Sequence, residues 1–523
     1  MLFVLPIGFG LCLSGIICLI RWLQEDTARF FFIGLDGMRW PLAIGLVVCI
    51  GFLFACIWLR LSRTKILAVL TVMILFGIAF QQAVRIDGYY GNRTPRFIWS
   101  WTPTAEQEVK TYFTSMKSKK KTSLQDDLFR TSQNDFDGLL GGDRTGHINA
   151  IGLISDWKSS QPKLLWRHPV GLGWSSMAVV GDVAISLEQR DDYECVVCYG
   201  LRLGNELWCH QEKTRFKHEY GDGPRSTPTV RAGRVLSMGA TGVLTCLDLP
   251  TGQLQWKDSV FNDSEKENLL FGTTSSPLVV DDRVIVTPGA GTNASAICYA
   301  MSSGEKLWRS GDDPASYASP AFANLVGTRQ VLSFNGAGLR SYGLDGESLW
   351  FHPWVTQGES RVNVAQPIVV ASDRDGCAEI LISSGYDRGT ALIKISRIKD
   401  AWSSEVLWTS NHLKSKLSNI VTLGGYVYGL DNGLLTCIDL ADGQRRWKRG
   451  RYGHGKLLLV GDKLLIQAES GEVVLVSADP TVHRELTRFQ ALESKTWNYP
   501  TLAGNVLVVR NDREAAAYEL PVE

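Results

Sequence analysis

A tryptophan that follows a glycine turn recurs along this chain, and this repeat limits the possible folds more than any other feature. The stretch "TCLDLPTGQLQW" (245–256) has relatives in "VCYGLRLGNELW" (197–208), "ICYAMSSGEKLW" (297–308), "RSYGLDGESLW" (340–350) and "TCIDLADGQRRW" (436–447). The repeated tryptophans stand at positions 166, 208, 256, 308, 350, 408 and 447, and Phe489 takes the same place once more. A spacing of 39 to 58 residues fits one four-stranded propeller blade per unit.

Each unit predicts four short strands joined by tight turns. "SSPLVVDDRVIVTPG" (275–289) predicts two strands around an Asp-Asp turn, "SAICYAM" (295–301) a third, and "SGEKLWRS" (303–310) a glycine turn before the fourth. The tryptophan then lies on the outermost strand, where its large apolar ring can pack between neighbouring blades. A single blade cannot bury its own faces, whereas a ring of blades can.

The two ends of the repeat region complement each other. "KLLWRHPV" (163–170) predicts a fourth strand without three strands before it, and "YPTLAGNVLVVRNDREAAAYEL" (499–520) predicts three strands without a fourth. Joining them in one blade removes the open edge of the ring. We therefore predict an all-β, eight-bladed propeller over residues 136–523, closed by a blade that both ends share.

The N-terminal part of the chain contains three apolar runs, at residues 1–20, 40–59 and 66–84. Each has the length of about 20 residues that a transmembrane helix needs. A cleaved signal peptide is the alternative for the first run, but the run has no basic n-region and no clear small-residue cleavage site follows it. The loop 60–65 carries Arg60, Arg63 and Lys65 without an acid, which places it in the cytoplasm and the propeller outside.

These features predict three parts: a membrane anchor of three transmembrane helices (1–84), a polar linker (85–135) and the propeller (136–523). The expected location is the inner (cytoplasmic) membrane as a multi-pass protein, with the propeller in the periplasm. The 54 Lys and Arg residues almost balance the 53 Asp and Glu residues. This balance argues against nucleic acid as a partner, because such surfaces need a marked basic excess.

The "LDLPTGQLQW" type of repeat in an eight-bladed ring resembles the pyrroloquinoline-quinone-like repeat propellers. The stretches "GWSSMAVVGD" (173–182), "EQRDDYECVVCYG" (188–200) and "GDGPRSTPTV" (221–230) resemble a bacterial, membrane-anchored subgroup of them. The resemblance implies one of two activities, since the family contains both quinoprotein dehydrogenases and the scaffold that helps to assemble outer-membrane barrels. The helices before the propeller also resemble the layout of membrane-bound glucose dehydrogenase.

Two motifs could carry chemistry or serve only the fold. The chemical interpretations are a redox dithiol or half of a zinc site for the first, and a calcium loop for the second. Cys195 and Cys198 form a C-x-x-C motif, but Cys198 belongs to a series that stands ten residues before a repeated tryptophan: Cys198, Cys246, Cys298 and Cys437. We interpret this position as core packing, where Cys serves as a small apolar residue. "DRDGCAE" (373–379) resembles a calcium loop but lacks a full ligand set, so we expect a hairpin turn there and no metal site.

The candidate ligand site lies just before each innermost strand, where propellers line the mouth of their central channel. These segments are rich in hydroxyl, aromatic and Arg side chains, a mixture that suits a ligand site. The alternative is that small polar residues simply solvate the channel. Two further residues, Glu188 and Arg190, end a strand nearby and could pair with each other or with a ligand. The candidate residues are Trp174, Glu188, Arg190, Glu219, Arg225, Tyr317, Gln366, His454 and Tyr499.

Two functions remain open from the sequence. The first is a membrane-anchored, extracytoplasmic scaffold without a catalytic residue or cofactor, which contacts lipid through its helices and binds another protein or a glycan. The alternative is a membrane-bound alcohol or sugar dehydrogenase that uses pyrroloquinoline quinone with calcium. The chain has no adjacent Cys-Cys pair and no C-x-x-C-H haem motif. We therefore expect the scaffold rather than the enzyme.

Overall fold

The computed structural model describes residues 62–91, 94–116, 126–149, 151–261, 268–356, 361–374 and 376–523. The chain divides into two compact units, Met1–Pro103 and Thr104–Glu523. The second unit contains every blade of the propeller.

The described part of the first unit contains one helix and one small sheet. Helix α3 (Arg63–Ala83) is followed by the antiparallel strands β1 (Val84–Tyr89) and β2 (Pro95–Trp99). The third predicted transmembrane segment falls on α3, and the first two lie outside the described residues. Among the residues that the structure describes, no helix combines the length and the apolar character needed to cross a membrane. The structure therefore gives no support for the three predicted membrane helices.

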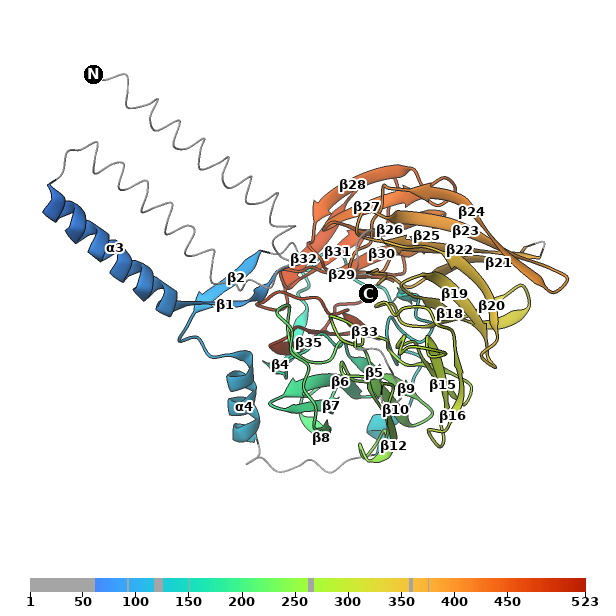
Figure 1. Ribbon diagram of the computed structural model, residues 1–523, viewed down its shortest axis with the longest axis horizontal. Coiled ribbons are helices and arrows are strands. Elements are labelled where there is room, and N and C mark those ends of the chain that lie inside the picture. The colour runs from blue at the N-terminus through green and yellow to red at the C-terminus, as the bar shows by residue number, and fades with distance from the viewer. Residues whose placement is uncertain are drawn as a thin grey trace, which may run out of the picture. The chain divides into compact units, whose positions relative to one another are not determined.

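The predicted eight-bladed propeller is confirmed: eight antiparallel blades follow one another around the ring (Figure 1). In the first four blades, the strands run in chain order from the innermost to the outermost. They are β5 (Ala178–Val180), β6 (Val183–Arg190), β7 (Tyr193–Gly200) and β8 (Glu206–Glu212); β9 (Thr229–Arg231), β10 (Arg234–Met238), β11 (Val243–Asp248) and β12 (Leu254–Ser259); β13 (Leu278–Val280), β14 (Arg283–Val286), β15 (Ala296–Ala300) and β16 (Lys306–Ser310); and β17 (Ala321–Leu325), β18 (Thr328–Phe334), β19 (Gly338–Gly343) and β20 (Ser348–Pro353).

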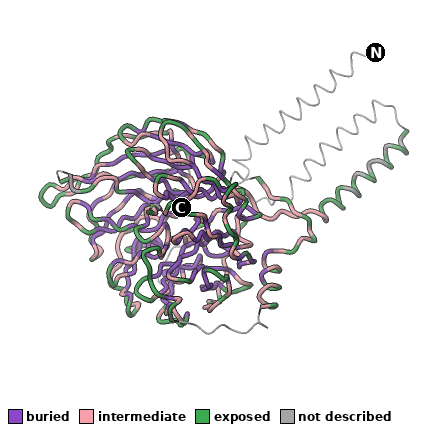
Figure 2. The backbone as a smooth tube through the Cα atoms, turned by 180° about the vertical axis from the view of Figure 1, so that it is seen from behind, coloured by how far each residue is buried: buried purple, intermediate pink, exposed green. Residues whose placement is uncertain are grey.

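The remaining blades follow the same order, except that the eighth takes its outermost strand from the start of the ring. They are β21 (Ile368–Arg374), β22 (Cys377–Ser384), β23 (Gly389–Ile398) and β24 (Ala401–Ser410); β25 (Val421–Leu423), β26 (Tyr426–Asp431), β27 (Leu434–Asp439) and β28 (Arg445–Arg451); β29 (Lys456–Val460), β30 (Lys463–Gln467), β31 (Glu472–Ser477) and β32 (Glu485–Gln490); and β33 (Thr501–Ala503), β34 (Val506–Arg510), β35 (Glu514–Glu519) and β4 (Lys163–Pro169). Burial is greatest on the inner and middle strands, and the outer strands carry more exposed residues (Figure 2).

The repeated tryptophan and glycine connect most blades to the next. The indole Nε1 of Trp208 donates a hydrogen bond to the carbonyl of Leu249 in the following blade at 2.9 Å. Gly252 of that following blade packs on the same indole, and a Cβ atom there would come within 2.5 Å of the ring. The φ angle of Gly252 is +68°, which also favours glycine. The repeat therefore needs glycine for two reasons, the turn itself and the close approach of the preceding tryptophan.

The cysteine pattern is explained by the same strand register. Cys198, Cys246, Cys298 and Cys437 pair directly with the tryptophans at 208, 256, 308 and 447 on the neighbouring strand, and all four are buried, free thiols. The core-packing interpretation is therefore confirmed for this series. The stretch 373–379 joins β21 to β22 as a hairpin, and its Asp375 lies outside the described residues.

Residues 85–135, expected to form a polar linker, contain further elements. Besides β1 and β2, they include helix α4 (Ala105–Met116) and the 3₁₀ turn η1 (Asp126–Phe129). Helix α4 begins with a capping box, in which the backbone N–H of Thr104 donates to the side chain of Gln107 and the Thr104 hydroxyl accepts the N–H of Gln107. Its Ala105 and Val109 are buried against the propeller unit.

A segment ahead of the first blade crosses the end of the ring where the innermost strands finish. Phe136 pairs with Val179 of β5, and strand β3 (His147–Ile148) pairs in parallel with the last two residues of β29. Between these contacts, Arg144 is buried and donates to the carbonyls of Ser276 (3.2 Å), Pro277 and Pro320 (2.9 Å) and to the Thr229 hydroxyl (3.2 Å). We call residues 136–148 the axial segment. It joins the innermost strands of several blades across the ring.

Candidate functional site

The predicted channel-mouth segments meet in one ring where the innermost strands begin, and the Arg144 guanidinium of the axial segment reaches the carbonyl of one ring member, Ser276. The residue two positions before each innermost strand defines this axial ring: Ser176, Thr227, Ser276, Ser319, Gln366, Asn419, His454 and Tyr499. Backbone N–H groups of one blade donate to side chains of another. Thr227 donates to Ser276 and Ser276 to Ser319, each at 2.9 Å. Tyr499 donates to Ser176 at 2.7 Å and so joins the last blade to the first.

The ring also passes across the seventh blade. The N–H of Gln366 donates to Oδ1 of Asn419 at 2.9 Å, and the N–H of Asn419 donates to the Tyr499 hydroxyl at 2.7 Å. The long Tyr499 side chain thus reaches from the eighth blade to the sixth. The side chains that form the ring are therefore held in place by the fold itself, which is the preorganisation that a ligand site needs.

One ring side chain is left without a hydrogen-bond partner. Gln366 is 3 % exposed, and neither its Nε2 nor its Oε1 atom has a partner in the described structure. Trp174, which precedes β5 and is 9 % exposed, likewise has an unpartnered indole N–H. Buried polar groups are normally hydrogen-bonded, and leaving one unsatisfied costs about 1–3 kcal/mol. These two groups point to a ligand or ordered water at the channel mouth.

Aromatic side chains form a belt beside the axial ring. Trp174 lies 4.7 Å from Trp497 between ring centroids, and Trp497 lies 6.4 Å from Tyr220. The contacts continue from Tyr220 to Phe271 (6.1 Å) and from Phe271 to Tyr317 (5.6 Å). The belt therefore follows the mouth from the eighth blade through the first to the fourth, and it offers flat apolar faces to a bound molecule.

Three cationic side chains accompany this belt. Arg225 donates to the carbonyls of Gly221 (2.7 Å) and Gly223, and burial lowers its pKa to about 10. Lys495 lies over the rings of Trp174 (5.2 Å) and Trp497 (4.7 Å). Lys456 is buried beside Tyr499, and desolvation lowers the pKa of its amine to about 7. Of the three cations, Lys495 is the one whose amine lies directly over aromatic rings of the belt.

The carboxylates near the mouth are already engaged or exposed. Glu469 accepts the indole N–H of Trp497 at 2.8 Å and the backbone N–H of His454 at 3.0 Å. Asp222 forms an ion pair with Arg215 at 2.9 Å, and Glu219 is exposed. Among the described residues, no group of three or more His, Cys, Asp or Glu side chains is placed to hold a metal ion.

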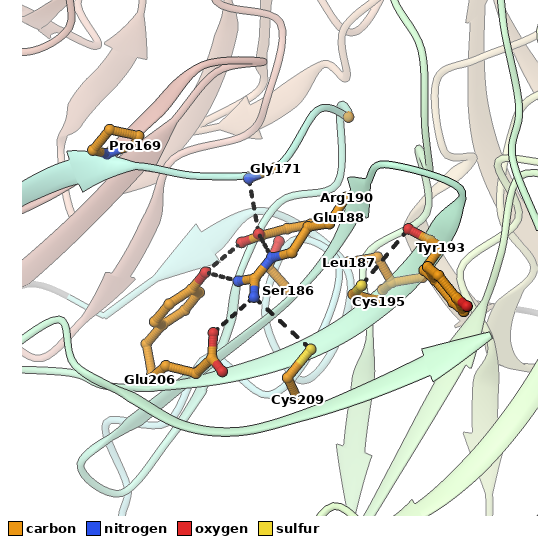
Figure 3. Close-up of polar contacts among 12 residues, drawn as sticks. Pro169, Gly171, Ser186, Leu187, Glu188, Arg190, Tyr193, Cys195, Glu206 and Cys209 are labelled. Atoms are coloured by element: carbon orange, nitrogen blue, oxygen red, sulfur yellow. Dashed lines mark hydrogen bonds and ion pairs between the residues drawn. The ribbon is translucent and has the colours of Figure 1, made fainter. Parts of the chain in front are cut away.

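Glu188 and Arg190 lie in a separate cluster on β6, as Figure 3 shows, rather than in the axial ring. Glu188 is fully buried and pairs with Arg190 at 3.1 Å, while it accepts the Tyr199 hydroxyl at 2.7 Å and the Gly171 N–H at 2.8 Å. Burial alone would raise the pKa of Glu188, but the charges of Arg190 and Arg510 outweigh it and hold the pKa below its usual range. The two residues therefore pair with each other, one of the two outcomes left open by the sequence.

Helix α4 packs on this cluster. The guanidinium of Arg190 lies 3.9 Å from the ring centroid of Phe113, and Arg190 also pairs with Glu206 at 2.8 Å. Tyr112 stacks on His168 of β4 at 5.1 Å. The cluster thus holds α4 in place where the first blade meets the closing blade. Glu188 and Arg190 therefore have a structural role.

The structure thus brings together six of the nine candidate residues: Trp174, Arg225, Tyr317, Gln366, His454 and Tyr499. It leaves Glu219 exposed beside them and places Glu188 and Arg190 elsewhere. The sequence analysis did not select Lys456, Lys495, Tyr220 or Phe271. Lys456 had a usable signal, because it begins an innermost strand two residues after His454. Tyr220 and Phe271 lie in irregular connections, where no repeat position marks them.

Glu194, which lies close to Arg225, provides a test of the electrostatics at this end of the ring. Burial raises its pKa to about 7, while the N–H of Ala240 (2.8 Å) and Arg225 partly oppose the shift. A raised carboxyl pKa means that its contribution to stability is complete below pH about 4.5 and is lost as the pH rises through about 7. We expect Glu194→Gln to be more stable than the parent by about 2 kcal/mol at pH 8 and nearly equal at pH 4.5.

Urea unfolding at both pH values would measure this difference. Glu305→Gln, which removes an exposed carboxylate, serves as the matched control for the substitution itself. A Glu194→Gln variant whose stability follows the parent at both pH values would show that this carboxyl is ionised normally.

The sequence and the fold of this chain can be compared with those of known proteins. Residues 192–449 match the family model described as outer membrane protein assembly factor BamB. The BamB structure from Moraxella catarrhalis is 16% identical, with a TM-score of 0.50 over 69% of this chain and 100% of its own. A quinohemoprotein alcohol dehydrogenase from Comamonas testosteroni is 12% identical, with a TM-score of 0.55 over 79% of this chain and 83% of its own.

A second such dehydrogenase, ADHIIG from Pseudomonas putida HK5, is 13% identical, with a TM-score of 0.56 over 76% of this chain and 83% of its own. No match was found among curated protein sequences. At these identities the structural likeness establishes the fold, and it extends to a scaffold and to enzymes alike. Together with the match of residues 192–449 to the repeat-family model, it shows a β-propeller fold whose sequence repeat is similar to the pyrroloquinoline-quinone-like type.

Proposed function

We propose that this protein is a membrane-anchored, extracytoplasmic binding scaffold that holds another protein or a glycan at its channel mouth. The observation that carries the proposal is the axial ring, in which the buried amide of Gln366 lacks a partner beside a belt of aromatic side chains. Such a surface binds through flat apolar contacts and a few fixed polar groups. Anchoring in the inner membrane and the periplasmic position rest on the three apolar runs and the basic loop 60–65 of the sequence.

The alternative function is a dehydrogenase that uses pyrroloquinoline quinone. The aromatic belt and the cations Arg225, Lys456 and Lys495 fit the flat ring and the carboxylates of this cofactor. They do not fit its calcium ion, since the carboxylates Glu469 and Asp222 are engaged and the described residues offer no metal-binding cluster. The cofactor would supply the redox chemistry, and no step through it is derived for this chain.

Photo-crosslinking from the mouth tests the scaffold. We expect p-benzoylphenylalanine in place of Tyr317 to form an adduct in intact cells, because Tyr317 lies in the aromatic belt. Phe322, an exposed aromatic residue on the innermost strand of the same blade, is the matched control and should form none. The Tyr317 adduct should disappear when Trp497→Ala opens the belt. An adduct from Phe322 alone, or none from Tyr317, would contradict binding at the mouth.

A further inference from the structure

The outermost strand of the sixth blade, β28, has an unusual charge. Its sequence, RRWKRGR, contains five cations in seven residues: Arg445, Arg446, Lys448, Arg449 and Arg451. None of the other seven outermost strands contains more than two Lys or Arg residues. The whole chain has a net charge of only +1, so this strand is a local concentration and not a general property of the surface.

Most of this charge is not neutralised by the protein. Arg446 pairs with Asp439 at 2.5 Å and Lys448 pairs with Asp431 at 2.7 Å. The other three, Arg445, Arg449 and Arg451, are exposed and have no ion pair with a carboxylate in the part of the chain that the structure describes. These three guanidinium groups therefore remain available to an anionic partner.

The strand is rigid and one of its edges is open. Trp447 in its centre is buried, and its indole donates to the carbonyl of Asp479 in the next blade at 2.9 Å. Strand β28 pairs with β27 on one side and ends the sheet on the other. An open edge presents backbone N–H and C=O groups that can pair with an added strand.

Charged residues on an edge strand often serve only to prevent aggregation. The other seven outer strands of this ring also end their sheets and carry far fewer cations, so protection alone does not require five. An anionic membrane would be attracted by cations anywhere on the surface. An extended acidic peptide uses both the charges and the open backbone edge, and it therefore fits the combination best.

We propose that β28 is a docking edge for an acidic, extended segment of a partner protein, which adds to the sixth blade as a fifth strand. The carboxylates of this segment pair with Arg445, Arg449 and Arg451 while its backbone continues the sheet. The fold already accepts a fifth strand elsewhere, since β3 extends the sheet of the seventh blade at its inner edge. This surface lies on the outside of the ring and is independent of the channel mouth.

The test uses the purified full-length chain and a fluorescent 12-residue peptide of alternating Glu and Val. We expect saturable binding that weakens about tenfold in the triple variant Arg445→Gln, Arg449→Gln, Arg451→Gln. The control triple variant, Lys163→Gln, Lys257→Gln, Lys306→Gln, changes the net charge equally on three other outer strands and should weaken binding by less than about twofold.

A peptide of the same sequence with N-methyl groups on alternate residues separates strand addition from plain charge attraction, because it cannot complete the backbone pairing. We expect it to bind at least about tenfold more weakly than the parent peptide. The proposal is overturned if the parent peptide does not bind, if both triple variants weaken it equally, or if N-methylation has no effect. Binding of the chain to anionic vesicles that depends on the three arginines, with no peptide binding, would assign the surface to a membrane instead.

Discussion

A chain that ends at Tyr499 should not accumulate as a folded propeller. The truncation removes β33, β34 and β35 and leaves β4 as the only strand of the closing blade. The lost strands contribute at least ten apolar residues to the core, among them Leu502, Leu507 and Val509, each at most 2 % exposed. Each of the larger side chains among them stabilises the fold by about 1.5–3 kcal/mol, so their combined loss is comparable to the 5–15 kcal/mol that a whole domain has available.

Soluble yield and thermal unfolding of the purified protein would measure the effect. A chain that lacks only residues 522–523 is the control, because it keeps all four strands and loses little beyond the bridge between Val522 and Leu153. We expect this control to melt within a few degrees of the parent. A chain ending at Tyr499 that still unfolds cooperatively near the parent temperature would contradict closure of the ring through the shared blade.

Replacing the buried Arg144 with Met should lower the free energy of unfolding strongly, although less than the truncation does. Arg144→Met removes the donor groups that satisfy three backbone carbonyls, of Ser276, Pro277 and Pro320, and the Thr229 hydroxyl. A buried acceptor without a partner costs about 1–3 kcal/mol, and Met fills the space without restoring any of these bonds. We expect a loss of about 3–5 kcal/mol in the free energy of unfolding, measured by urea titration.

The matched control is Arg231→Met. Arg231 contacts the same axial segment through an ion pair with Asp137 at 3.0 Å, but its side chain is 46% exposed. An exposed ion pair contributes at most about 1 kcal/mol. If both substitutions cost the same, Arg144 does not join the axial segment to the innermost strands in the way that the geometry shows.

The blade pattern was predictable because a tryptophan and a glycine perform the same packing task in most successive blades, as Trp208 and Gly252 do. The axial ring was predictable for the same reason, since its members stand at a fixed distance before each innermost strand. The side chains of β6, however, bring Glu188 to the Tyr199 hydroxyl and Arg190 to the ring of Phe113 in α4. No repeat signal indicates where α4 packs.

The axial segment was also beyond the sequence analysis. Residues 136–148 follow no strand or helix period, and the stretch "GGDRTG" (141–146) reads as an ordinary loop. Arg144 acquires its role only from carbonyls more than one hundred residues further along the chain. Long-range contacts of this kind depend on the closed ring and leave no local pattern.

One experiment distinguishes the scaffold from the enzyme most directly. The purified full-length chain is titrated with pyrroloquinoline quinone and calcium, and dye reduction is then measured with a panel of alcohols and aldoses. A scaffold whose mouth carboxylates are engaged or exposed predicts no turnover that depends on the cofactor. Stoichiometric cofactor binding with turnover that disappears in Arg225→Ala or Glu219→Gln would contradict the scaffold and establish the dehydrogenase.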